Sequence, residues 1–110
     1  RLEEAAAICD EVGSPGLALM ADFFHMHTEE ADPPAAIRQA GDWLKHVHLA
    51  DSNRMSPGTG HTDFVTWFRA LADVRFQGYM ALECGFGADR QAELARAVRF
   101  LRGAIGTARS

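Results

Sequence analysis

The chain has 110 residues, 15 acidic and 11 basic side chains, and a formal net charge of −4. This length is typical of one domain, and a hydrophobic content of 47% argues against a disordered chain. The mild acidity gives no general basic footprint for nucleic acid, and no apolar run approaches the roughly 20 residues that cross a bilayer. We therefore expect neither a nucleic-acid partner nor a membrane. The two cysteines, Cys9 and Cys84, are too few for a disulfide scaffold and favour a reducing, cytoplasmic location.

The first half of the chain alternates helical and strand-like segments. Strong helix formers with apolar residues at helical spacing predict a helix over 2–12, which a Gly-Ser-Pro-Gly turn ends. The uninterrupted apolar run 17–20 is typical of a strand buried on both faces, and it leads to Asp22. We expect a loop with at most a short helical turn over 23–34. Two prolines then suit the first turn of a helix over 35–44, in which an internal glycine is the weak point.

The second half repeats the same order. Residues 46–51 have the alternating character of a strand, and the Ser-, Pro- and Gly-rich residues 52–62 predict a loop. A helix is expected over 64–74, with its aromatic residues on one buried stripe. A third strand over 79–84 and a long helix over 89–106 complete the chain. A unit of helix, strand and loop therefore occurs three times.

This order predicts right-handed crossovers and a parallel sheet, and therefore an α/β fold. A closed (β/α)8 barrel needs about 250 residues, so the chain is well under half of one. The chain begins at Arg1, directly in a helical pattern, and we expect further residues upstream of it.

Polar and ionisable residues follow all three predicted strands: Asp22 and His25, His48 and Asp51, and Glu83. Ligand sites of α/β folds lie beyond the carboxyl ends of the strands, so these residues are expected at one rim. The donors of Asp22, His48 and Glu83 suit Mn²⁺, Mg²⁺, Co²⁺ or Zn²⁺. The alternatives are that Asp22 caps its loop, that His48 is a hydrogen-bonded core histidine, and that Glu83 is a solvated carboxylate.

Further polar residues are expected near the same rim. His25 and Arg54 offer an imidazole and a guanidinium to hydroxyl or phosphate oxygens of a small polar ligand. A surface arginine in a polar loop is the alternative for Arg54. His46 shares a strand face with His48 and would lie one layer deeper, in a packing role. His61 is expected to help order the Gly-rich loop.

A family resemblance is carried by three segments in this order and spacing: MADFFHMHTEE, HVHLADSNRMSPGTGHTDF and GYMALEC. They resemble the C-terminal part of the sugar phosphate isomerase/epimerase family, the xylose isomerase-like TIM barrels. Within it, the chain is most similar to the D-tagatose, D-psicose and L-ribulose 3-epimerases. The resemblance implies that residues 1–110 form the C-terminal part of a single TIM-barrel domain, about three βα units plus a leading helix, whose N-terminal strands are absent. One departure is Phe23, where the family pattern often has threonine.

The resemblance also implies a set of site residues. In this family a divalent metal is held by Glu, Asp, His and Glu from the last four barrel strands. Asp22, His48 and Glu83 would be the last three ligands, with Mn²⁺ the expected ion and the first glutamate on a strand upstream. His25 and Arg54 match positions that contact substrate oxygens. Glu83 would also be one of the two catalytic glutamates that exchange protons with the sugar.

The implied function is that of a divalent-metal-dependent epimerase or isomerase of a ketose or sugar phosphate, working by proton transfer through an enediolate. We expect this isomerase activity only for the full-length barrel, acting on a small sugar in a homo-oligomer. The alternatives are an inosose dehydratase or hydroxypyruvate isomerase on the same scaffold, and a non-catalytic barrel fragment that binds a ligand or another chain. Apurinic-site endonucleases share the scaffold, but their multi-metal sites and DNA-binding surfaces do not match this acidic chain.

Overall fold

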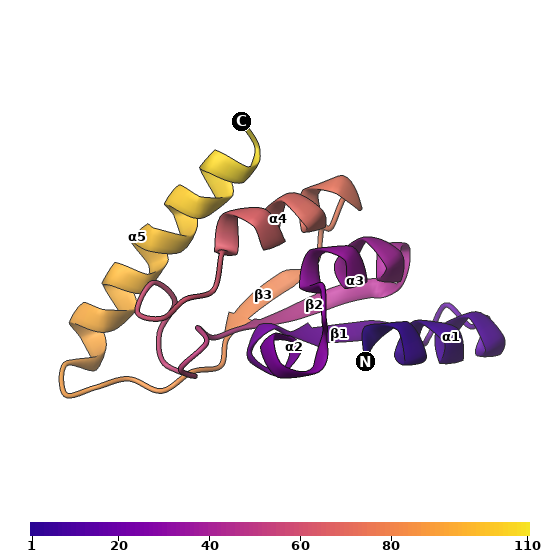
Figure 1. Cartoon of the computed structure of the whole chain (residues 1–110), viewed down its shortest axis with the longest axis horizontal. Helices are drawn as coiled ribbons and strands as arrows, with labels where there is room; N and C mark the ends of the chain where they lie inside the picture. Colours follow the sequence, from indigo (N-terminus) through magenta and orange to yellow (C-terminus); the bar gives the residue numbers. More distant parts are fainter.

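Helices and parallel strands alternate along the chain in the computed structural model, which describes residues 1–110 (Figure 1). The helices are α1 (Leu2–Val12), α2 (Phe23–Glu29), α3 (Pro33–Ala40), α4 (Phe64–Asp73) and α5 (Arg90–Ala108). The strands are β1 (Leu19–Asp22), β2 (Leu44–Leu49) and β3 (Tyr79–Leu82), and a 3₁₀ turn, η1 (Gly41–Trp43), precedes β2. The predicted α/β class is confirmed, with three βα units after a leading helix.

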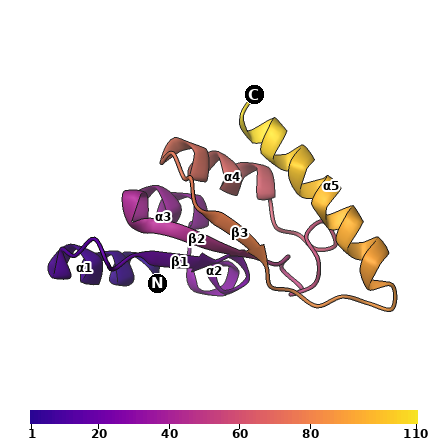
Figure 2. The ribbon, with the colours of Figure 1, turned by 180° about the vertical axis from the view of Figure 1, so that it is seen from behind.

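The three strands form one parallel sheet in the order β1-β2-β3, so β2 is central and each outer strand has a free edge. The register pairs Asp22 with His48 and His48 with Ala81, two residues before Glu83. Because alternate residues of a strand face the same side, these residues share one face of the sheet. We call this the inner face, and its residues are Met20, Asp22, His46, His48, Tyr79, Ala81 and Glu83. Helices α3 and α4 lie side by side over the opposite, outer face (Figures 1 and 2).

The hydrophobic core lies between the outer face and the helices. Ala21, Val47 and Leu49 of the outer face are all buried, with 2% exposure or less. The aromatic stripe predicted on α4 packs against them together with Phe23, whose ring lies 4.8 Å from that of Trp67. The prediction that these aromatic residues belong to the core is confirmed.

Helix α2 is the main difference from the predicted elements, since a loop with no more than a short helical turn was expected over 23–34 and the structure has a seven-residue helix there. The carboxylate of Asp22 accepts a hydrogen bond from the backbone N–H of His25 (3.1 Å) and so caps the first turn of α2. Phe23 and Met26 of this helix are buried, which anchors it over the core. The cap and these two buried residues stabilise a helix that the mixed composition of the segment did not indicate.

Other boundaries shift by a few residues. Strand β1 begins at Leu19 and includes Asp22, β2 begins and ends two residues before the predicted 46–51, and β3 ends at Leu82. Helix α3 begins at the two prolines and ends at Ala40, directly before Gly41, which has a positive φ of 56°. Where each strand ends depends on which residues of the neighbouring strand pair with it. The sequence of one strand alone does not specify this pairing.

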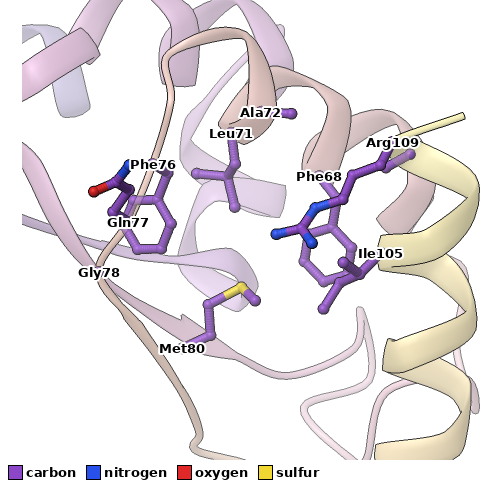
Figure 3. A pocket seen from close by; sticks show the side chains of 10 residues that line it. Phe68, Leu71, Ala72, Phe76, Gln77, Gly78, Met80, Ile105 and Arg109 are labelled. Carbon is purple, nitrogen blue, oxygen red and sulfur yellow. The ribbon is translucent and has the colours of Figure 1, made fainter.

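A cavity of about 310 Å³ lies between α4, the start of β3 and the end of α5 (Figure 3). Leu71, Met80 and Ile105 are among its apolar lining, and Arg109 is its only charged residue. It exists because α5 packs against α4 and leaves the outer side of β3 partly uncovered. None of the predicted site residues lines this cavity. None of the helices combines the length and hydropathy that a membrane span requires.

Candidate metal centre

Asp22, His48 and Glu83 meet where the three strands end. Each side chain offers one ligand atom, and these atoms lie within 4.8 Å of one another. His48 Nδ1 is 3.8 Å from Asp22 Oδ2 and directly contacts Glu83 Oε2. The three residues are 26 and 35 positions apart in the sequence, so the parallel order of the strands is what brings them together.

Asp22 uses its two carboxylate oxygens differently. Oδ1 accepts the hydrogen bond from the backbone N–H of His25 that caps α2, and Oδ2 faces His48. The capping role that the sequence left open is therefore present, and it leaves the second oxygen free for the centre. The side chain is 19% exposed, so most of it is enclosed by the fold and part of it remains open to solvent.

His48 and Glu83 complete the cluster from the two neighbouring strands. The backbone N–H of Glu83 donates to the carbonyl of Leu49 (3.0 Å), which ties the residue after β3 to the end of β2. The Glu83 side chain is 54% exposed and that of His48 is 25% exposed. The His46 ring lies 5.0 Å from the His48 ring, edge to face, one layer deeper on the inner face. Glu83 is therefore the member of the cluster most open to a ligand.

The donor set fits a divalent cation. Two carboxylates and an imidazole are ligands that Mn²⁺, Zn²⁺ and related ions accept. Metal–ligand bonds of about 2.0–2.2 Å place neighbouring ligand atoms roughly 3–4 Å apart. The 3.8 Å between His48 Nδ1 and Asp22 Oδ2 lies in this range. Three protein ligands also leave coordination positions for water or substrate, as in catalytic sites.

Arg54 and His25 both lie close to one aromatic ring, that of Phe24. The guanidinium of Arg54 lies 5.1 Å above the ring of Phe24, and the ring of His25 is 5.3 Å from the same ring. A hollow of about 190 Å³ opens beside Asp22 and His25. The structure thus places both predicted substrate-contacting residues near Phe24, in the first turn of α2, and the guanidinium of Arg54 contacts this ring.

Asp51 has a role that the sequence did not indicate. It is buried, and its carboxylate accepts backbone N–H donors of Ser52 (2.8 Å), Gly58 (2.7 Å) and Thr62 (3.0 Å). Burial alone would raise the pKa of Asp51, but these hydrogen bonds and one from Gly60 outweigh it and lower the pKa. The signal in the sequence was an aspartate directly before a loop rich in Ser and Gly, where it can accept several backbone donors.

The expectation for His61 is met only in part. Its backbone N–H donates to Ser52 Oγ (2.8 Å), but its side chain is exposed and makes no hydrogen bond. The loop is therefore ordered by Asp51 and by backbone donors, and the imidazole is not needed for it.

A sequence profile of the xylose isomerase-like TIM barrel family matches residues 1–104. The chain belongs to this family. Among curated members, it is similar to a D-psicose 3-epimerase of Enterocloster bolteae, with 43% identity over 74% of the chain and 27% of that protein. An L-ribulose 3-epimerase of Methylomonas sp. shows 38% identity over 73% of the chain and 28% of that protein.

Solved structures of xylose isomerase-like barrels agree with this assignment. An L-ribulose 3-epimerase superposes with a TM-score of 0.91 and 28% identity, over 98% of this chain and 42% of that one. A D-psicose 3-epimerase, determined in the presence of D-fructose, gives a TM-score of 0.87 and 30% identity, over 96% and 44%. The chain thus spans less than half the length of the relatives that it matches.

Proposed function

We propose that this chain is part of a divalent-metal-dependent sugar epimerase or isomerase that acts on a ketose or sugar phosphate through an enediolate. The observation that carries the proposal is the meeting of Asp22, His48 and Glu83 at the strand ends of a chain in this family. The relatives support the choice of substrate class, since they include D-psicose, L-ribulose and ketose 3-epimerases.

Residues 1–110 form, in this proposal, the C-terminal part of a single TIM-barrel domain, and activity needs the complete barrel. Both edges of the sheet are free, and parallel strands are normally paired and covered on both faces. On the inner face Tyr79 is 84% exposed and Met20 is 47% exposed, although both are large residues with apolar surface to bury. Further strands would pair with these edges and cover this face. We expect the complete protein to be cytoplasmic and homo-oligomeric.

Asp22, His48 and Glu83 would hold the metal, with Mn²⁺ the expected ion and Mg²⁺, Co²⁺ or Zn²⁺ the alternatives. The bound ion supplies Lewis acidity that stabilises negative charge on the oxygens of the sugar. Glu83, the most exposed member of the cluster, takes the proton from the carbon beside the carbonyl, and the electrons of the C–H bond pass into the enediolate. His25 and Arg54 donate hydrogen bonds to hydroxyl or phosphate oxygens and so orient the sugar. A second acid would then donate its own proton, to the opposite face for epimerisation or to the neighbouring carbon for isomerisation, and Glu83 would pass the proton it took to solvent before the next turnover.

The test replaces Glu83 by glutamine in the full-length protein that contains this segment. Glu83→Gln keeps the shape and removes the base, so turnover of a ketose should fall by on the order of 10²–10⁴-fold. Mn²⁺ affinity, measured by calorimetry, should fall as well. Glu11→Gln, an exposed residue of α1 outside the centre, is the matched control and should change neither quantity.

Product analysis separates this proposal from other reactions on the same scaffold. NMR of the products formed from a ketose and from an inosose distinguishes an epimerase or isomerase from a dehydratase. Undiminished ketose turnover in Glu83→Gln would remove Glu83 from the mechanism. Absence of any ketose product in the full-length protein would refute the proposed activity.

A further inference from the structure

The loop between β2 and α4 is built around a buried carboxylate that has no cationic partner. Asp51 is 1% exposed, and no lysine, arginine or histidine pairs with it. Its Oδ1 accepts from the N–H groups of Ser52 and Thr62, and its Oδ2 accepts from Gly58. A buried carboxylate is stable only when hydrogen bonds replace its water. Asp51 therefore holds the beginning, the middle and the end of the loop at one point.

The space around this carboxylate is closed. A Cβ atom on Gly60 would lie 2.5 Å from Asp51 Oδ1, so only glycine allows the loop to approach so closely. The loop conformation is therefore set by Asp51 and Gly60 together.

A further set of hydrogen bonds, all between backbone groups, fixes the conformation of Arg54 within this loop. Its N–H donates to the carbonyl of Asp51 (2.9 Å), and its own carbonyl accepts from the N–H of Gly85 (2.9 Å), which follows β3. The N–H of Asp51 in turn donates to the carbonyl of Met55 (3.0 Å). Arg54 has a φ of 64°, in the left-handed region that costs free energy for any residue with a Cβ atom. The surrounding loop imposes this conformation.

The imposed backbone conformation of Arg54 directs its side chain toward Phe24. From this position the guanidinium of Arg54 extends to the ring of Phe24, 5.1 Å away, at the first turn of α2. The arginine thus joins the segment after β1 to the segment after β2. A guanidinium held in this way loses little further freedom when it binds an oxygen of a ligand.

We propose that Asp51 is a positioning residue: its buried carboxylate shapes the loop that holds Arg54 in a left-handed conformation, over Phe24, where the guanidinium binds the sugar. The identity of the ligand rests on the proposed function. The placement of Arg54 by Asp51 does not, and it can be tested in this chain alone.

The decisive variant is Asp51→Asn, with Asp63→Asn as the matched control. Both oxygens of Asp51 accept N–H donors, so an asparagine NH₂ must face one of these donors whichever way the amide is turned. The Asp63 carboxylate accepts from the backbone N–H of Thr66 (3.2 Å) with one oxygen and from the Thr66 hydroxyl (2.7 Å) with the other. Asparagine satisfies both groups there, because its NH₂ donates to the hydroxyl. The two variants make the same change of charge at the two ends of the loop.

NMR of this chain provides the first readout. Amide exchange of Gly58 and Thr62 should accelerate by about tenfold or more in Asp51→Asn, and the ring-current shift of the Arg54 side chain over Phe24 should disappear. Both should persist in Asp63→Asn. If the Arg54 shift persists in a folded Asp51→Asn chain, the positioning role is refuted.

A second pair of variants covers the case in which Asp51→Asn does not fold. Arg54→Gly and Arg54→Ala both remove the side chain, but only glycine relieves the left-handed backbone. Arg54→Gly should therefore resist urea better than Arg54→Ala. If Arg54→Ala is equally stable or more stable, the loop does not impose the conformation and the proposal fails.

A double-mutant cycle in the full-length protein provides the functional readout. Asp51→Asn should raise KM for the ketose about tenfold with a smaller change in kcat, and should have no further effect on KM when Arg54 is already alanine. Additive effects on KM would refute action through Arg54. A wild-type protein without ketose turnover would refute the proposed function alone, and the NMR comparison would still decide the role of Asp51.

Discussion

The two faces of the sheet differ in how far this chain completes them. On the outer face, Ala21, Val47 and Leu49 are buried beneath the chain's own helices. On the inner face Met20 and Tyr79 are exposed, and the candidate metal ligands Asp22, His48 and Glu83 lie on the same face. The contrast teaches that the packed outer face stabilises the chain, whereas the candidate metal ligands lie on a face that the helices of this chain leave uncovered.

The largest expected effect is on the outer side. Phe23 is fully buried against Trp67, Phe64 and Phe68, so Phe23→Ala leaves a cavity that the rigid surroundings fill poorly. We expect the free energy of unfolding to fall by about 3–5 kcal/mol, measured by urea denaturation. A loss below about 1 kcal/mol would show that the helices do not pack on the sheet as described.

The next effect concerns pH and the rim loop. The pKa of Asp51 is lowered from its ordinary value of 3.8 in the folded chain, so its carboxylate contributes stability above that pH and loses it as the pH falls through the lowered pKa. Asp51→Asn should therefore cost roughly 2–3 kcal/mol near neutral pH, with the difference from wild type shrinking below pH 3.8. Urea denaturation from neutral pH to strong acid measures this. Parallel stability curves for the two chains would contradict it.

On the inner face, a substitution of a candidate ligand should change Mn²⁺ affinity with little change in the free energy of unfolding. Asparagine caps a helix about as well as aspartate, so Asp22→Asn should change the free energy of unfolding by less than about 0.5 kcal/mol. The same change removes a charged oxygen from the centre, and Mn²⁺ affinity should fall by on the order of tenfold or more. Calorimetry with Mn²⁺ and denaturation of the same samples test both halves. A large loss of stability would mean that the charge of Asp22 stabilises the fold beyond its role as a cap, and unchanged Mn²⁺ affinity would remove Asp22 from the centre.

The sequence predicted the features that depend on periodicity and chain order. Helical spacing located α1, α4 and α5, and the repeated order of elements indicated the parallel sheet. That order also brought Asp22, His48 and Glu83 to one rim, although no local spacing links them. Features of this kind need only the direction of each strand and the identity of its last residues.

Features that depend on loop conformation were not predictable in the same way. The donors that surround Asp51 are backbone N–H groups, which every residue carries, so the sequence does not mark them. The left-handed conformation of Arg54 is imposed by contacts with residues on two loops, and arginine itself does not favour it. Helix α2 was predicted only as a short helical turn, because the Asp22 cap and the burial of Phe23 and Met26 that extend it depend on the folded structure.

The prediction with the smallest expected effect tests the contrast between the two faces of the sheet most directly. Tyr79 is 84% exposed on the inner face, so Tyr79→Ala should change the stability of this chain by less than about 0.5 kcal/mol. In a protein that carries the remaining strands of the barrel, the same side chain would be packed inside, and its truncation should cost about 3 kcal/mol or more. Urea denaturation of both proteins measures the difference. A small cost in both would mean that no further strands cover the inner face, and the proposed single barrel domain would be wrong even if the metal centre binds its ion.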